Sequence, residues 1–141
     1  MNLYLDTSAL VKLYVSEAGS ADVRGWVSAA SIVGTSRVAY PEARAALARC
    51  KRERALTAAG LRTAVSALDA DWGTYVVVEL AAPLASAAGL LAERRALRGF
   101  DAIHLASAKE LARLLGDAVT LGAFDARLAA AARAERLAVL P

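Results

Sequence analysis

Four acidic residues stand at the boundaries of apolar or helical segments in this chain: Asp6, Glu42, Asp101 and Asp125. They lie in the blocks LYLDTSAL, YPEARAAL, GFDAIHLASA and GAFDARL. Carboxylates gathered in one crevice repel one another, so they stay ionised mainly where hydrogen bonds or a bound cation stabilise the negative form. Carboxylate oxygens suit Mg²⁺ or Mn²⁺, which activate water and neutralise charge on a phosphoryl oxygen. The layout predicts a shared cation site suited to cutting phosphodiesters.

Each acid also has a simpler explanation. Asp101 and Asp125 are good N-cap or first-turn residues, where a carboxylate offsets the helix dipole and accepts hydrogen bonds from free N–H groups. Glu42 alone is typical of a solvated helix residue. Asp6 is harder to explain in this way, because an acid at the end of a buried strand must find polar partners.

The elements that must position these acids alternate along the chain. Short apolar runs predict strands, and longer amphipathic segments predict helices, the first of them with Ser8 as a plausible N-cap. The expected strands are residues 2–5, 32–35, 74–80, 118–123 and 137–140. The expected helices are residues 8–15, 20–30, 37–54, 56–72, 83–97, 100–115 and 126–136. This order predicts an α/β fold with a parallel sheet covered on both faces, in a single domain over residues 1–141.

Ligands of such sheets bind outside the carboxyl ends of the strands. Asp6 follows the first expected strand and Asp125 follows a later one, so both project into one crevice if those strands are neighbours. Asp101 begins a helix entered from the same edge, and Glu42 lies near the start of another. The topology thus predicts that all four acids meet.

Composition bounds the class of protein. The chain has 17 basic and 14 acidic residues. If four of the acids lie in one pocket, only ten acids remain on the rest of the protein to offset the 17 bases, so that surface is basic. A basic surface around an acidic pocket suits a nucleic-acid substrate, although an arginine-rich chain is also simply soluble. The lone Cys50 excludes an internal disulfide. No secretory leader is expected, because Asp6 and Lys12 interrupt the N-terminal apolar stretch and no basic segment comes before it. The uncharged stretch 80–92 is too short and too broken for a membrane span, so we expect a cytoplasmic protein.

Other catalytic chemistries lack their residues. His104 is the only histidine, which excludes paired-imidazole RNA cleavage, and one His with one Cys makes no ordinary zinc site. No nucleophile elbow or phosphate-binding P-loop occurs. His104 lies one helical turn after Asp101 and could hydrogen-bond it, but a lone His on an apolar helix is usually a packed residue. Two or three of the arginines near the acids are expected to contact RNA phosphates; they are Arg37, Arg44, Arg49, Arg94, Arg95 and Arg98.

The blocks YLDTSALVKLY, PEARAALAR, LRGFDAIHLASA and FDARLAAAA resemble the four acidic motifs of PIN-domain ribonucleases, particularly the VapC-type toxins of bacterial toxin–antitoxin pairs. The resemblance covers nearly the whole chain. It implies a PIN-like three-layer α/β/α fold with a central parallel sheet of four to five short strands. It also implies an Mg²⁺- or Mn²⁺-dependent endoribonuclease that leaves a 5′-phosphate and a 3′-hydroxyl and is inhibited by a small cognate antitoxin.

By this likeness the four acids are the metal-binding and catalytic set. Asp6 and Asp101 are expected to be the principal ligands that place the metal on the scissile phosphate. Glu42 and Asp125 complete the ligand shell, or hold and deprotonate the attacking water. The hydroxyl residues beside the first acid are expected to orient a carboxylate or a metal-bound water; they are Thr7 and Ser8.

The chain departs from the family at one position and leaves two alternatives open. Ala123 stands two residues before the fourth acid, where Thr or Ser is common. A catalytically degraded PIN fold that only binds a partner is one alternative, and the four intact acids argue against it. A phosphatase or response-receiver domain is the other, but Ser8 stands where a phosphatase has its second Asp.

The resemblance also predicts partners. The antitoxin is expected to place a basic side chain in the acidic pocket, where it takes the place of the metal. A homodimer is expected as well. We expect the apolar helices near Val11, Val15 and Trp26 to form these contacts.

Overall fold

The computed structural model describes residues 1–141 and contains one parallel sheet with the strand order β3-β2-β1-β4-β5. The strands are β1 (Asn2–Leu5), β2 (Ile32–Ser36), β3 (Val76–Val78), β4 (Val119–Gly122) and β5 (Ala138–Leu140). The helices are α1 (Thr7–Leu10), α2 (Ser20–Ala29), α3 (Ala39–Arg52), α4 (Ala58–Trp72), α5 (Ala82–Arg95), α6 (Gly99–Leu115) and α7 (Ala126–Ala134), with a 3₁₀ turn at Val11–Leu13. Every expected element is present, and all five strands run parallel.

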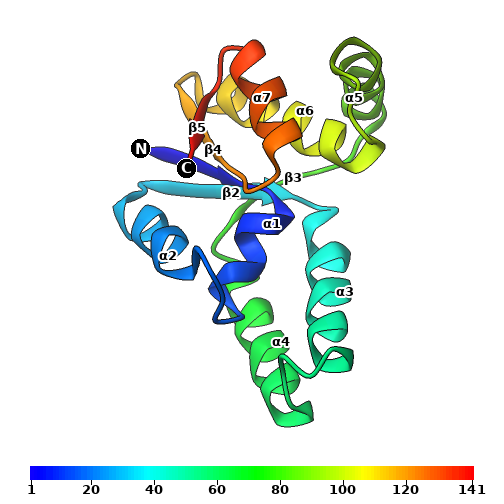
Figure 1. Cartoon of the computed structure of the whole chain (residues 1–141). Coiled ribbons are helices and arrows are strands. Elements are labelled where there is room, and N and C mark those ends of the chain that lie inside the picture. The colour runs from blue at the N-terminus through cyan, green and yellow to red at the C-terminus, as the bar shows by residue number, and fades with distance from the viewer.

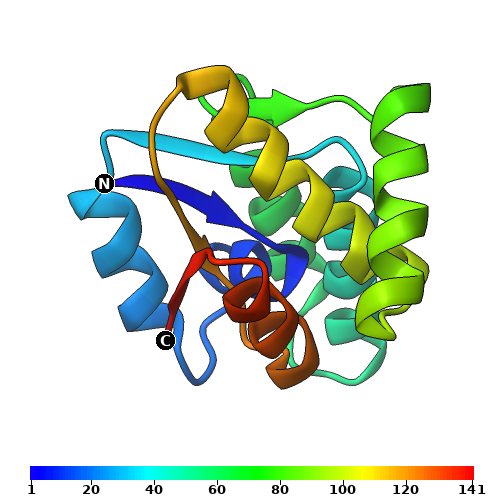
Figure 2. The same cartoon turned by 90° about the horizontal axis from the view of Figure 1, so that it is seen from above.

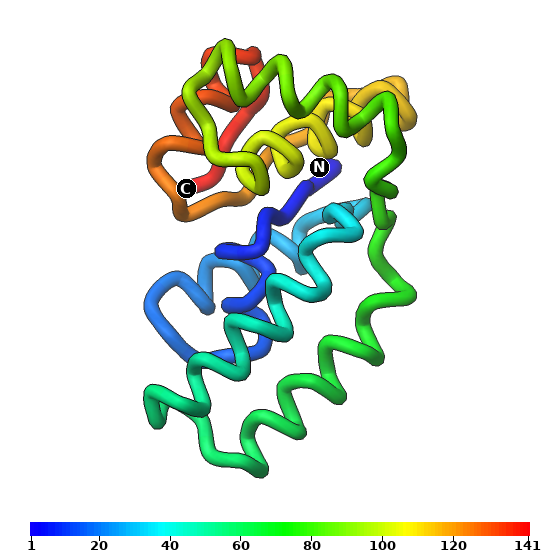
Figure 3. The backbone as a smooth tube through the Cα atoms, turned by 90° about the vertical axis from the view of Figure 1, so that its right-hand side faces the viewer, coloured from blue at the N-terminus to red at the C-terminus, as the bar shows by residue number.

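The helices form a layer on each face of the sheet (Figure 1). Helices α5, α6 and α7 cover one face, and Figure 2 shows α6 lying across the strands. Helices α1 to α4 cover the other face, where α3 and α4 form a hairpin that extends away from the sheet (Figure 3). This is the predicted three-layer α/β/α arrangement.

Strand β1 supplies both hydrophobic cores. Tyr4 packs in the core under α5, α6 and α7, whereas Leu3 and Leu5 pack in the core under α1 to α4. Successive side chains of a strand point to opposite faces, so a strand covered on both sides is apolar throughout. On the neighbouring strand, a Cβ at Gly34 would collide with Leu111, so this glycine lets α6 lie directly on the sheet.

Several boundaries differ from those expected. Ser8 is not the N-cap of the first helix: Asp6 is, and its carboxylate accepts a hydrogen bond from the Ala9 N–H at 2.9 Å. The expected helix 37–54 begins only at Ala39, because the Arg37 N–H donates to Val78 O across the sheet. The strand expected from residue 74 begins at Val76, because the N–H and hydroxyl of Thr74 both bind Asp71 O at the end of α4.

None of the helices is both long enough and apolar enough to cross a membrane.

Candidate active site

The four acids converge at the carboxyl edge of the sheet. Strands β1 and β4 are neighbours, as the prediction required, and Asp6 extends their ladder by donating its N–H to Gly122 O at 3.1 Å. Helices α3 and α6 begin at the same edge and carry Glu42 and Asp101 in their first turns. Together with Asp125 these residues line one cavity of about 650 Å³.

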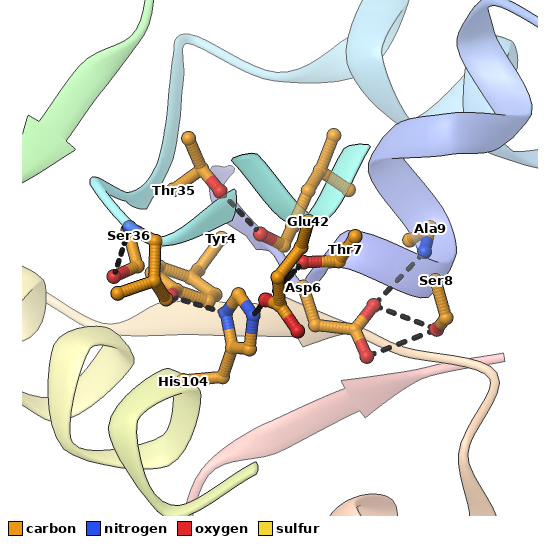
Figure 4. A network of polar contacts seen from close by, with 11 residues as sticks. Tyr4, Asp6, Thr7, Ser8, Ala9, Thr35, Ser36, Glu42 and His104 are labelled. Carbon is orange, nitrogen blue, oxygen red and sulfur yellow. Dashed lines mark hydrogen bonds and ion pairs between the residues drawn. The ribbon is translucent and has the colours of Figure 1, made fainter. Parts of the chain in front are cut away.

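Asp6 is the most buried of the four, with 4% of its surface exposed. The Ser8 hydroxyl lies 2.8 and 2.9 Å from its two carboxylate oxygens. Figure 4 shows Ser8 beside the Asp6 carboxylate. Burial raises the pKa of Asp6, against the lowering effects of His104 and of the hydrogen bonds from Ala9 and Ser8. Asp6 forms no ion pair within the chain. The protein therefore provides hydrogen bonds to this carboxylate but no cationic side chain that pairs with it.

Glu42 is held by a chain of polar side chains from three elements (Figure 4). The Thr7 hydroxyl donates to Glu42 Oε1 at 2.7 Å, and His104 Nε2 lies 2.8 Å from the same oxygen. Tyr4 Oη lies 2.8 Å from His104 Nδ1. If the Tyr4 hydroxyl donates to Nδ1, Nε2 carries the ring hydrogen and donates it to Glu42. Burial opposes ionisation, but the hydrogen bonds from His104 and Thr7 outweigh it and lower the pKa of Glu42.

Two predictions about His104 can now be separated. It is a buried, satisfied residue, as expected of a lone histidine on an apolar helix. It does not hydrogen-bond Asp101, so that expectation is wrong: the imidazole turns toward Tyr4 and Glu42, while Asp101 pairs with Arg98. Sequence alone gave no signal for Tyr4, whose partner lies 100 residues away.

Asp101 and Asp125 share a single arginine. Arg98 Nε lies 3.1 Å from Asp101 Oδ2, and Arg98 Nη2 lies 3.8 Å from Asp125 Oδ2. Asp125 is also the N-cap of α7 and accepts the Leu128 N–H at 2.8 Å. Asp101 lies in the first turn of α6. For these two acids the capping explanation and the shared-pocket explanation hold together.

The hydroxyl residues orient carboxylates, as predicted. Thr7 binds Glu42 and Ser8 binds Asp6. Ser8 Oγ also accepts the Phe124 N–H at 3.0 Å, which ties α1 to the loop before Asp125. Ala123, which replaces the more usual hydroxyl residue, is buried and supplies no side-chain hydrogen bond. Ser8 is therefore the hydroxyl that fixes this loop.

The donor set fits a hard cation in type but is not arranged as a closed metal site. No three His, Cys, Asp or Glu side chains of the chain lie in positions that would hold an ion. The cavity nevertheless offers four carboxylates, and both hydrogen bonds to Glu42 go to Oε1, which leaves Oε2 without one. Both ring nitrogens of His104 are engaged, so the available ligands are oxygens, which Mg²⁺ and Mn²⁺ prefer.

Comparison with known proteins identifies this arrangement. The PIN domain family model matches residues 3–134. The chain belongs to the PIN-domain family. Within it the chain is of the VapC type: it is 39% identical to Ribonuclease VapC45 of Mycobacterium tuberculosis (strain CDC 1551 / Oshkosh) over 140 residues, or 99% of this chain and 94% of the relative. Ribonuclease VapC47 of the same strain is 34% identical over 139 residues, covering 93% of this chain and 90% of the relative.

Solved PIN structures share the fold. FitAcB from Neisseria gonorrhoeae superposes with a TM-score of 0.69 at 16% identity, covering 99% of this chain and 96% of that one. VapC20 of Mycobacterium tuberculosis gives a TM-score of 0.66 at 24% identity, covering 92% and 95%. The PIN family model and the VapC relatives confirm the resemblance drawn from the acidic motifs, and they show that the phosphatase or response-receiver alternative is wrong.

Basic side chains surround the acids of this PIN domain. Of the six arginines expected near the acids, only Arg49 and Arg98 line the cavity. Arg37 pairs with Glu79, and Arg94 and Arg95 pair with Glu135. The sequence analysis missed the two other basic residues of the cavity wall, which are Lys12 and Arg52.

Two features bear on partner surfaces. Val11 and Val15 are buried in the core, and Trp26 stacks on Phe124 with ring centroids 5.6 Å apart. The two valines are therefore not available as the contact surface expected for them.

A larger hollow of about 820 Å³ lies beside α5 and α6. Its wall is mostly apolar and contains none of the four acids.

Proposed function

We propose that this PIN domain is an endoribonuclease toxin that hydrolyses RNA phosphodiesters with the help of Mg²⁺ or Mn²⁺. The observation that carries the proposal is the convergence of four carboxylates in one cavity at the carboxyl edge of the sheet. The chain is also 39% identical, over nearly its full length, to proteins named as ribonucleases.

The metal would be held by the acids at the centre of the cavity. Asp6 is the first candidate, because burial raises its pKa and no cation of the protein pairs with it. Asp101 and Asp125 add two further carboxylates to the same cavity. A divalent ion bound there would lower the pKa of water and neutralise charge on a phosphoryl oxygen.

Glu42 is placed to orient the attacking water. The hydrogen bonds from Thr7 and His104 fix Oε1, so that Oε2 is the oxygen left to accept a hydrogen bond. The lowered pKa keeps Glu42 ionised at neutral pH, when it can accept such a bond but holds a proton only weakly. Its part is therefore to position the attacking water rather than to retain the proton of that water.

The basic wall of the cavity would position the RNA backbone. Arg49 forms no ion pair within the chain, and Arg98 is 74% exposed, so both guanidinium groups are accessible to phosphates. Contacts of this kind hold a strand without reading its sequence. Lys12 is already engaged, by Glu17 at 3.0 Å and by the ring of Phe124 at 4.5 Å.

A small antitoxin is the proposed partner. Solved structures of this fold include FitAB bound to a DNA fragment, with a TM-score of 0.67, and a toxin–antitoxin complex from Klebsiella pneumoniae, with a TM-score of 0.57. An antitoxin arginine or lysine in the acidic cavity would satisfy the carboxylates as a metal does. We also propose that the chain forms a homodimer.

Co-expression with the adjacent small reading frame, followed by size-exclusion chromatography, tests both partners. We expect a complex of the two proteins in which RNA cleavage is suppressed. A monomer that never co-purifies with that product would contradict both parts of the proposal.

The activity itself is tested with a fluorescent single-stranded RNA. Cleavage should require Mg²⁺ or Mn²⁺ and stop in excess chelator, and the products should carry a 5′-phosphate and a 3′-hydroxyl. Asp101→Asn, purified in the same way, controls for contaminating nucleases and should be inactive. Undiminished cleavage by the wild type in excess chelator would overturn the mechanism.

A further inference from the structure

Arg98 is the only permanently charged side chain that pairs with any of the four acids, and it pairs with two of them. The only other basic partner is His104, which contacts Glu42. Arg98 stands at the N-cap position of α6, but its side chain makes no capping hydrogen bond. It reaches Asp101 on its own helix and Asp125 at the start of α7, at 3.1 and 3.8 Å. The guanidinium thus joins two carboxylates from separate elements, which a purely local helix-surface pair would not do.

The pairing is suited to exchange. The Arg98 side chain is 74% exposed, and ion pairs of exposed side chains contribute little to stability. A divalent ion that takes Asp101 and Asp125 as ligands removes both partners of the guanidinium and repels it. A released arginine at the rim of this cavity presents a planar fork of donors, which matches a phosphate group.

We propose that Arg98 is an exchangeable counter-cation of the active site. In the metal-free protein it pairs with Asp101 and Asp125 and offsets part of their negative charge; when the metal binds, Arg98 leaves them and binds a phosphate of the RNA. The proposal rests on the proposed function, because it assumes a metal at the acids and an RNA substrate. Metal binding would then favour RNA binding, and the coupling would be reciprocal.

The test compares two arginines of the same cavity. Arg98→Met removes the guanidinium that pairs with the acids, while Arg49→Met removes an unpaired guanidinium from the cavity wall. Both variants lose one positive charge, so the general electrostatic effect on metal binding is matched. Isothermal titration calorimetry with Mn²⁺, without RNA, measures the dissociation constant of each protein.

Arg98→Met is expected to bind Mn²⁺ about two- to fivefold more tightly than the wild type, the range that an exposed ion pair allows, and more tightly than Arg49→Met. The same variant should have a several-fold higher KM for RNA, because a phosphate contact is lost. Arg98 would therefore oppose metal binding and promote RNA binding, whereas a merely structural arginine moves neither quantity in this pattern.

Two failures can be told apart. If the wild type binds no Mn²⁺, the proposed function falls and the exchange falls with it. If the wild type binds Mn²⁺ but Arg98→Met has the Mn²⁺ affinity of Arg49→Met, or the KM of the wild type, only the exchange is overturned.

Discussion

Two carboxylates of this protein have opposite electrostatic surroundings. Glu135, at the end of α7, has a side chain only 7% exposed and is surrounded by Lys109, Arg94 and Arg95. Hydrogen bonds from Lys109, then from the two arginines, lower the pKa of Glu135 to about 2. Asp6, with 4% of its surface exposed, forms no ion pair and has its pKa raised by burial.

The difference separates a structural site from a functional one. At Glu135 the protein supplies more positive charge than the carboxylate needs, and the contacts join α5, α6 and α7. At Asp6 the protein supplies hydrogen bonds but leaves the charge for an external cation to balance. Carboxylates held without internal counter-charge are characteristic of functional sites. Substitutions in the two regions should therefore damage different properties.

The largest effect is expected for Glu42→Gln. The amide keeps the shape of the side chain but loses the charge that orients water, so the rate of RNA cleavage should fall by at least about a hundredfold. The melting temperature should fall only slightly, because the amide oxygen can still accept the hydrogen bonds from Thr7 and His104, although more weakly than the carboxylate does. Single-turnover cleavage and thermal melts measure the two quantities, and a well-folded variant that retains the wild-type rate would remove Glu42 from the mechanism.

Glu135→Gln should do the reverse. Three cationic side chains lose their shared acceptor, so the free energy of unfolding should fall by about 1–3 kcal/mol. The rate of RNA cleavage per folded molecule should stay at the wild-type value, since Glu135 does not line the acidic cavity. Urea unfolding and cleavage assays on the same preparations decide this, and a cleavage defect without a loss of stability would contradict the division between the regions.

The pH dependence of Glu135 has a definite sign. The pKa is lowered in the folded state, so the carboxylate stabilises the fold above its ordinary pKa and loses that contribution as the pH falls. The difference in unfolding free energy between the wild type and Glu135→Gln should be constant near neutral pH and shrink from pH 4.5 toward about 2. Urea unfolding as a function of pH measures it, and a gap that widens on acidification would refute the assignment.

A smaller effect is expected at His104, and two amides separate its contacts. The Gln amide reaches the position of Nε2 and can still donate to Glu42, whereas the Asn amide reaches that of Nδ1 and can contact only Tyr4. Residues that orient a ligand carboxylate affect activity by about tenfold or more, so His104→Asn should lose about tenfold in rate. His104→Gln should lose less. Equal rates for the two variants, after correction for the folded fraction, would mean that the contact with Glu42 is unimportant.

Much of the fold and part of the site could be predicted from the sequence. The convergence of the four acids could be predicted, because each lies next to a strand end or a helix start, and parallel strands bring those ends to one edge. The support of Glu42 could not be predicted, since Tyr4 and His104 are 100 residues apart and nothing local connects them.

The arginines show the same limit. Arg94, Arg95 and Arg98 are neighbours in sequence, yet the first two bind Glu135 and only the third reaches the acids. Ala96, between them, takes a left-handed backbone at the end of α5 and redirects the chain. A non-glycine residue in that conformation gives no local sequence signal, because the surrounding structure imposes it.

The central claim is that the negative charge at Asp6 is balanced by an external cation and not by a side chain of the protein. Thermal melts of the wild type and Asp6→Asn test this claim most directly. Asn caps a helix about as well as Asp, and burial no longer opposes an ionised group, so the metal-free variant should be as stable as the wild type or more so, by about 1 kcal/mol. Millimolar Mn²⁺ should raise the melting temperature of the wild type through binding to the folded state, and raise that of the variant much less. A destabilised Asp6→Asn whose melting temperature rises with Mn²⁺ as much as that of the wild type would contradict the account.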